Sequence, residues 1–346
     1  MPEVLGRSVY LSESSGAFPE TLGTGGVPVF LSLNRTEEMD ETWKERVIRF
    51  CGELNEHGCR VLADISRRTL RAMEVDTVKQ LRGLLNLLAV RIDYGFTADE
   101  IKDIKEEVPV TLNASTITEK ELLLLGDTTN LYAMHNFYPR PETGLDERYL
   151  KAQTMLCQRF KMPVLAFIPG TGNKRGPVYE GLPTLEAHRH INPLAAAADL
   201  KLNYGVNRIY VGDPEIDDVM EQRINRFLSE GILEIHARLE EGYEGLYDKI
   251  LTNRVDSPKG LIRVAESREY STSNGIHIPA ENTAPRVRGT ITADNENYPR
   301  YCGEVMITRK DYPADHRVNV IGTIAEADIP VLDMIGRSGQ FVLIRE

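Results

Sequence analysis

The segment HNFYPRPETG, residues 135–144, gathers side chains that can do acid-base and binding chemistry. It supplies an imidazole, a carboxamide, a phenol, a guanidinium and a carboxylate, from His135, Asn136, Tyr138, Arg140 and Glu142 respectively. Pro139 and Pro141 restrict the backbone φ angles around the carboxylate. Such a loop can hold Glu142 still without regular hydrogen bonds, as a proton donor or acceptor requires.

A second polar segment, PGTGNKRGPVYEGLPTLEAHRH at residues 169–190, combines glycines with charged side chains. Its candidates for ligand binding are Gly170, Lys174, Arg175 and Glu186. Backbone amides and basic side chains together bind phosphate well, although the GxxxxGK[ST] spacing of a P-loop is missing. A solvated loop surface is the simpler explanation for Lys174 and Arg175.

Two carboxylates on different loops around one cavity are the minimum equipment for glycoside hydrolysis. We assign Asp93 and Glu142 as this pair, because one must protonate the leaving oxygen while the other stabilises or attacks the anomeric carbon. The same residues would also serve an aldolase, isomerase or epimerase acting on a phosphorylated sugar. No predicted strand ends in lysine, which argues against a Schiff-base aldolase.

Eight short apolar segments predict the strands that position these loops. They are residues 8–11, 27–33, 60–65, 88–94, 108–114, 131–137, 162–168 and 208–213. Helical periodicity lies between most of them, and Thr118 with Glu121 forms a capping box for a helix that Gly126 can end. Nearly continuous apolar strands alternating with helices indicate an α/β fold of the (β/α)8 TIM barrel type, with a doubly wound open sheet as the alternative.

One unit of this pattern is irregular. Residues 12–26 are too rich in Gly, Ser and Pro for a helix, so we expect the barrel to be open or thinly covered there.

A TIM barrel has its active site at the C-terminal ends of the strands. The polar residues predicted there are Asp64, Arg91, Asp93, Asn113, Ser115, His135, Asn136 and Asp213. Simpler explanations are a helix cap for Asp64 or Asp213 and a hydrogen-bonded core histidine for His135. His188 and His190 lack HExxH spacing, so we expect neither a metal nor a cofactor.

Past about residue 236 the pattern changes to strands separated by turns, with little helix apart from residues 325–336. The sequence therefore predicts a barrel domain at 1–235 and a small, mostly β domain at 236–346. A polar cluster in the second domain is interpreted as a lid or an oligomer contact, or as a turn with a surface strand; it comprises Asp294, Asn295, Tyr298, Arg300, Tyr301 and Glu304.

The composition of the chain limits the classes of partner that the protein is expected to bind. The 346 residues include 41 Lys and Arg against 52 Asp and Glu, and the net charge of −11 argues against nucleic acid. The four cysteines lack CxxC spacing, which indicates free thiols. No signal peptide or apolar run of membrane-spanning length is present, so we expect a cytoplasmic protein with no membrane partner.

Several strings of this chain resemble the 6-phospho-N-acetylmuramidase family. They are SVYLSE, RIDYGF, LNAST, HNFYPRPETGL, AFIPG, RGPVYEGLPTLEAHR, ITADNENYPRYCGEVMI and HRVNVIGTI, and they run through nearly the whole chain. The resemblance implies a TIM barrel followed by a cyclophilin-like β domain. It also implies a cytoplasmic enzyme of peptidoglycan recycling that cleaves the β-1,4 bond of MurNAc-6-phosphate–GlcNAc.

Carried onto this sequence, the resemblance implies a site of Asp64, Asp93, Asn113, His135, Asn136, Tyr138, Arg140, Glu142 and Glu186, with Arg175 and its glycines as candidates for the 6-phosphate. We assign Glu142 as acid/base and Asp93 as its partner; the 2-acetamido group of the substrate is an alternative nucleophile. Two other functions compete with this one: another phosphosugar isomerase or lyase, and a non-catalytic phosphosugar sensor. The alternatives for the oligomeric state are a monomer and a homo-oligomer. Residues 12–26 are shorter than is usual in the family, so the pocket beside the first two strands is expected to differ.

Overall fold

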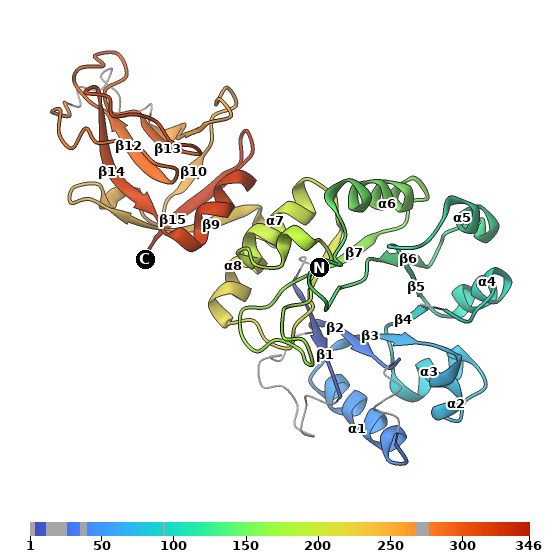
Figure 1. Ribbon diagram of the computed structural model, residues 1–346. Coiled ribbons are helices and arrows are strands. Elements are labelled where there is room, and N and C mark those ends of the chain that lie inside the picture. The colour runs from blue at the N-terminus through green and yellow to red at the C-terminus, as the bar shows by residue number, and fades with distance from the viewer. Residues whose placement is uncertain (1–3, 12–25, 35–39, 93, 268–276) are drawn as a thin grey trace. The chain divides into compact units, whose positions relative to one another are not determined.

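The computed structural model describes residues 4–11, 26–34, 40–92, 94–267 and 277–346 (Figure 1). The chain divides into two compact units, Met1–Gln222 and Arg223–Glu346. Helix α8 (Asp218–Glu230) begins in the first unit and ends in the second. Within the described part of the chain, no helix combines the length and the apolar character needed to cross a membrane.

The first unit is a closed barrel of eight parallel strands. They are β1 (Gly6–Val9), β2 (Pro28–Ser32), β3 (Arg60–Ile65), β4 (Ala89–Ile92), β5 (Val110–Asn113), β6 (Leu131–Met134), β7 (Val164–Ile168) and β8 (Arg208–Val211). The helices between them are α1 (Trp43–Glu56), α2 (Arg67–Ala72), α3 (Val78–Leu85), α4 (Ala98–Glu107), α5 (Glu119–Leu125), α6 (Glu147–Arg159) and α7 (Pro193–Leu202), with the 3-10 helix η3 (Glu186–His188) before α7. The predicted TIM barrel is confirmed, and the doubly wound alternative is excluded.

The sheet is closed beside the first strand, because β1 pairs with both β2 and β8. The expectation of an open barrel there is therefore wrong, because backbone pairing on both sides of β1 completes the ring. Residues 12–25, whose covering we expected to be thin, lie outside the described residues. The predicted capping box is confirmed, since Thr118 accepts from the Glu121 N–H, Glu121 caps the Thr118 N–H, and Gly126 ends α5.

Apolar side chains fill both faces of the barrel sheet. The outer face packs on α1 to α6, and Trp43, Val47, Cys51 and Leu54 are buried on one side of α1. Leu84 of α3 is exposed, because its helix turns this position to solvent. The inner face carries Phe30, Leu62, Met134, Phe167 and Tyr210.

Aromatic rings form the part of the inner core that lies nearest to the C-terminal ends of the strands. The Phe167 ring centroid lies 5.3 Å from that of Phe30 and 5.0 Å from that of Phe137, both in edge-to-face geometry. Phe137 follows β6, so this cluster reaches from the barrel interior to the C-terminal rim.

The second unit is a seven-stranded, mostly antiparallel sheet. In spatial order its strands are β10 (Ile250–Thr252), β15 (Gln340–Arg345), β9 (Ile232–Leu239), β14 (Val318–Ile324), β12 (Thr290–Asp294), β13 (Val305–Thr308) and β11 (Leu261–Arg263). A bridge between Asn253 and Val264 joins its two edge strands, so the sheet curls back on itself. Besides the end of α8, this unit contains the 3-10 segments η4 (Glu244–Leu246) and η7 (Glu326–Met334), which agrees with the predicted mostly β domain.

Substitution of Gly6 tests how closely the barrel interior is packed. A Cβ at Gly6 would lie 2.3 Å from a ring carbon of Tyr210, whereas a Cβ at Gly52 on the exposed side of α1 would meet nothing within 4 Å. We expect Gly6→Ala to lower the free energy of unfolding by about 1–3 kcal/mol through overpacking. Gly52→Ala should raise it by about 0.5–1 kcal/mol, because alanine favours helix. Chemical unfolding of the two variants measures both, and effects of the same sign would contradict the described packing.

Candidate active site

The C-terminal ends of neighbouring strands bring three predicted residues together. Asp64 of β3 lies opposite Arg91 of β4, and the Arg91 Nη1 donates to Asp64 Oδ1 at 2.8 Å. These side chains are only 10% and 6% exposed. Arg91 Nη2 also donates to the side-chain oxygen of Asn136, which follows β6. Arg91 therefore connects the C-terminal end of β3 with the segment after β6, because it bonds to both Asp64 and Asn136.

Ser115 connects the end of β5 with the segment after β6. Asn113 Oδ1 accepts from the Ser115 N–H at 3.0 Å, and Ser115 Oγ accepts from the Asn136 N–H at 2.9 Å. The Tyr138 phenol is half buried, which raises its pKa, while hydrogen bonds to Ser115 and Asn136 act in the opposite direction. The predicted residues Asn113, Asn136 and Tyr138 thus form one group around a serine.

His135 is fully buried behind this group. Its Nδ1 lies 3.3 Å from Ser115 Oγ and its Nε2 lies 3.0 Å from Thr154 Oγ1 of α6. Burial lowers the pKa of His135 to about 4, so the ring is neutral at pH 7. Direct contact of His135 with a ligand would require one of these bonds to break, and its surroundings match the core-histidine alternative.

The Glu142 loop has an unusual backbone. Glu142 is exposed and has a φ of +67°, a conformation that costs energy for a residue other than glycine. Arg140 also exposes its side chain, while its carbonyl accepts from the Thr143 hydroxyl at 2.6 Å. Pro139 and Pro141 flank this turn, as the sequence indicated. Backbone strain of this kind is commonly found where a side chain must be held for function.

An ion pair between the buried Arg189 and the partly exposed Glu186 holds that loop. Glu186 Oε1 accepts from the Glu142 N–H at 2.9 Å, and Oε2 accepts from the Gly144 N–H at 2.7 Å. Arg189 donates Nε to Oε1 at 2.6 Å and Nη2 to Oε2 at 2.7 Å. The Arg189 hydrogen bond is the main reason that the Glu186 pKa falls to about 2, assisted by the two backbone amides. A Cβ at position 144 would lie 2.6 Å from Glu186 Oε2, which explains the glycine.

Asp213, which follows β8, holds the loop after β7. Its Oδ2 accepts from the N–H groups of Gly170 and Leu182 at 2.9 and 3.2 Å, and its Oδ1 accepts from the Arg175 N–H at 3.3 Å. A Cβ on Gly170 would lie 2.1 Å from the Glu215 carbonyl oxygen. Gly170 is therefore needed for the close approach of two backbone segments.

Arg175 lies between two aromatic rings. Its guanidinium carbon is 4.8 Å from the ring centroid of Tyr10, which follows β1, and 4.9 Å from that of Phe137. Within the described parts of the chain it makes no ion pair, and its buried Nε has no hydrogen-bond partner. Burial raises the Tyr10 pKa although Arg175 opposes this, and the Tyr10 hydroxyl donates to the Gly212 carbonyl at 2.6 Å. The neighbouring Lys174 ammonium lies 3.5 Å from a carbonyl of its own loop.

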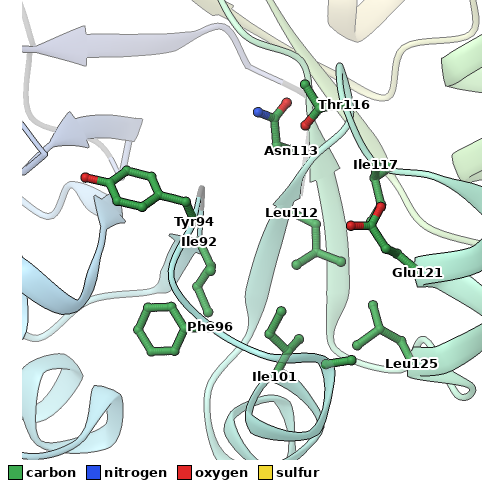
Figure 2. A pocket seen from close by; sticks show the side chains of 11 residues that line it. Ile92, Tyr94, Phe96, Ile101, Leu112, Asn113, Thr116, Ile117, Glu121 and Leu125 are labelled. Carbon is green, nitrogen blue, oxygen red and sulfur yellow. The ribbon is translucent and has the colours of Figure 1, made fainter.

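A cavity of about 160 Å³ opens between the segments that follow β4 and β5 (Figure 2). Its floor is apolar, with Ile92, Leu112, Ile101 and Leu125. Its polar wall consists of Asn113, Thr116, Glu121 and Tyr94, the last 58% exposed. Asp93, the second carboxylate of our predicted pair, lies outside the described residues. No group of three His, Cys, Asp or Glu side chains suited to a metal occurs among the residues that the structure describes.

Three residues at this rim were not among the predicted site residues: Tyr10, Phe137 and Arg189. Tyr10 and Phe137 close apolar strand segments and look like core positions in the sequence, while Arg189 was noted only as part of a charged loop. Polar residues at strand ends were the available signal, and it does not detect an aromatic ring that packs on a cation.

Fold and site define the first unit as a TIM-barrel protein whose candidate site lies at the C-terminal rim. The family model described as 6-phospho-N-acetylmuramidase, N-terminal, matches residues 5–226, and the one described as 6-phospho-N-acetylmuramidase, C-terminal, matches residues 233–344. The chain therefore belongs to the 6-phospho-N-acetylmuramidase family, as its sequence strings indicated.

Two solved structures are similar over the whole chain. A conserved protein of unknown function from Enterococcus faecalis is 29% identical with a TM-score of 0.81, covering 99% of this chain and 96% of its own. An uncharacterized B. cereus protein is 22% identical with a TM-score of 0.77 and full coverage of both chains, which shows a shared fold. No curated protein matches the sequence.

His135 predicts a pH dependence of stability. Its folded pKa of about 4 lies below the ordinary 6.5, so protons bind preferentially to the unfolded chain and stability falls as the pH drops from about 6.5 to about 4. We expect His135→Gln to flatten this part of the curve of unfolding midpoint against pH. His190→Gln, at an exposed position, is the control and should keep the wild-type slope. Parallel curves for wild type and His135→Gln would contradict the assignment.

Proposed function

We propose that this protein is a glycoside hydrolase that cleaves the β-1,4 bond between N-acetylmuramic acid 6-phosphate and N-acetylglucosamine. Membership of the 6-phospho-N-acetylmuramidase family supports the reaction class. The observation that carries the proposal is the Arg175 guanidinium, which lies at the barrel rim between two aromatic rings without an acidic partner among the described residues.

Arg175 would bind the 6-phosphate. A guanidinium presents five N–H donors in a planar fork that matches phosphate oxygens, and stacking on Tyr10 and Phe137 fixes its plane before the ligand arrives. Lys174 and the amide of Gly170, from the same loop, are further candidates for the phosphate.

Glu142 would act as the acid and base. As acid it protonates the glycosidic oxygen while the bond from that oxygen to C1 of the muramic acid breaks; as carboxylate it then removes a proton from the water that attacks C1. Its backbone is held by Glu186, so its carboxylate is presented from a fixed turn. The same β6–α6 segment supplies Phe137 to Arg175, which supports a site shared by the proposed acid and the proposed phosphate-binding cation.

The positive charge that develops at C1 needs a partner. Asp93 would stabilise it or orient the 2-acetamido group, whose oxygen can itself attack C1 and be displaced by water. Sugar hydroxyls or the lactyl carboxylate would bind to polar residues of the same rim, namely Asp64, Asn113, Asn136, Tyr138 and Arg140.

The cellular role that fits this reaction is peptidoglycan recycling in the cytoplasm, where the products return to cell-wall synthesis. The curled sheet of the second unit would then be the cyclophilin-like domain of the family, acting as a lid or as an oligomer contact. A prolyl isomerase activity does not follow from such a fold.

A product assay tests the reaction. Purified protein is incubated with MurNAc-6-phosphate–GlcNAc, and we expect Glu142→Gln to reduce kcat by about 10²–10⁴-fold, the usual contribution of a general acid. Glu147→Gln, an exposed glutamate at the start of α6, is the matched control and should be as active as wild type. Tight binding without product by wild type would favour a sensor, and turnover of free sugar phosphates would favour an isomerase or lyase.

Comparison with the unphosphorylated disaccharide tests the phosphate site. One charge-assisted hydrogen bond contributes about 1.5–3 kcal/mol, so Arg175→Met should lower kcat/KM for the phosphorylated substrate by about 10–100-fold. The same variant should leave the unphosphorylated substrate nearly unaffected. Arg148→Met, an exposed arginine of α6, serves as control. Equal losses on both substrates would remove Arg175 from the phosphate role.

A further inference from the structure

Arg189 is 2% exposed and all of its N–H groups point at protein acceptors. Nη1 donates to the carbonyls of Gly181 and Glu180 at 3.0 and 3.4 Å. Nη2 donates to the carbonyls of Tyr138 and Arg140 at 3.0 and 3.3 Å, in addition to its bond to Glu186. One guanidinium therefore joins the loop after β6 to the loop after β7, and none of its five donors remains for a ligand.

Glu186 is equally occupied. Each of its carboxylate oxygens accepts two hydrogen bonds, one from a backbone amide of the Glu142 loop and one from Arg189. A carboxylate has about four acceptor sites, so a sugar hydroxyl could bind Glu186 only by displacing one of these donors. This distinguishes Glu186 from a substrate-binding carboxylate, the role that the sequence had suggested.

We infer that Arg189 and Glu186 are positioning residues, which act through Glu142 and hold its carboxylate at a fixed place relative to Arg175. The inference rests on the proposed role of Glu142 as the acid. Its basis is connectivity: Glu186 holds the amides of residues 142 and 144, while Arg189 holds the 138–140 and 180–181 carbonyls. A substrate that must contact both the acid and the cation depends on the separation of these two loops, and a displacement of about 1 Å at a reacting group can cost about 10²-fold in rate.

Gly144→Ala is the mildest perturbation. Its Cβ would lie 2.6 Å from Glu186 Oε2 and 2.8 Å from the Glu186 backbone nitrogen, so the loop must move away while both charges of the ion pair remain. We expect kcat for the phosphorylated disaccharide to fall about 10–100-fold with KM changing less than about threefold. Gly83→Ala on α3, where a Cβ meets nothing within 4 Å, is the matched control and should have wild-type kcat.

Arg189→Lys and Glu186→Gln test the two members directly. Lysine keeps the charge but cannot span both loops, so the same loss of kcat at nearly constant KM is expected. Glutamine replaces an acceptor oxygen by a donor and should release one of the two amides. A loss confined to KM in all three variants would instead assign Glu186 to substrate binding, and unchanged kinetics would overturn the inference.

Amide hydrogen exchange separates this inference from the proposed function. The N–H groups of Glu142 and Gly144 should exchange slowly in the wild-type protein and at least tenfold faster in Glu186→Gln, whether or not the protein cleaves any glycoside. Rapid exchange of both amides in the wild type would contradict the positioning role while leaving the hydrolase proposal intact. Slow exchange in a wild-type protein without hydrolase activity would have the opposite meaning, because the loop would be held but the acid role would fail.

Discussion

The ion pair between Arg189 and Glu186 holds the candidate site together, because the two loops that carry Glu142 and Arg175 contain little regular secondary structure. Arg189 bonds to carbonyls on both sides of the gap between these loops, and Glu186 accepts the amides that a left-handed turn at Glu142 presents. Such a turn is unfavourable for a glutamate unless its surroundings determine it. The pair provides that determination, because Arg189 is buried and each Glu186 oxygen accepts two hydrogen bonds. Removal of Glu186 would leave the buried Arg189 charge without its carboxylate.

Closure of the sheet supplies the other constraint. Eight parallel strands bring eight C-terminal ends to one rim, so residues as distant in sequence as Tyr10, Phe137 and Arg175 come into contact. The aromatic core of the barrel continues through Phe167 and Phe137 to the guanidinium of Arg175. The rigid apolar interior therefore orients a cation at the rim. In a protein of net charge −11, a cation held in this way is the feature on which the proposed phosphate site rests.

Local patterns in the sequence predicted the eight strands, the capping box at Thr118 and a proline-restrained loop around Glu142, since periodicity, caps and prolines act within a few residues. The positive φ of Glu142 was not predicted. They did not predict what each polar residue binds. His135 and Asn136 are adjacent in the chain, yet His135 is buried against Thr154 and Asn136 bonds to Arg91. The register of β6 in the barrel decides which partner each side chain contacts, and local sequence patterns do not reveal that register. Glu186 looked like a ligand-binding carboxylate because its partner Arg189 and the amides of residues 142 and 144 meet it only in the folded barrel.

The most direct test of this account is a crystal structure of the Glu142→Gln variant with MurNAc-6-phosphate–GlcNAc bound. The account predicts phosphate oxygens within about 3 Å of the Arg175 guanidinium, and the side chain of residue 142 within hydrogen-bond distance of the glycosidic oxygen. In the same complex the Arg189–Glu186 pair should be unchanged and should not touch the sugar. A phosphate bound away from Arg175, or a glycosidic oxygen beyond the reach of residue 142, would contradict the proposed site.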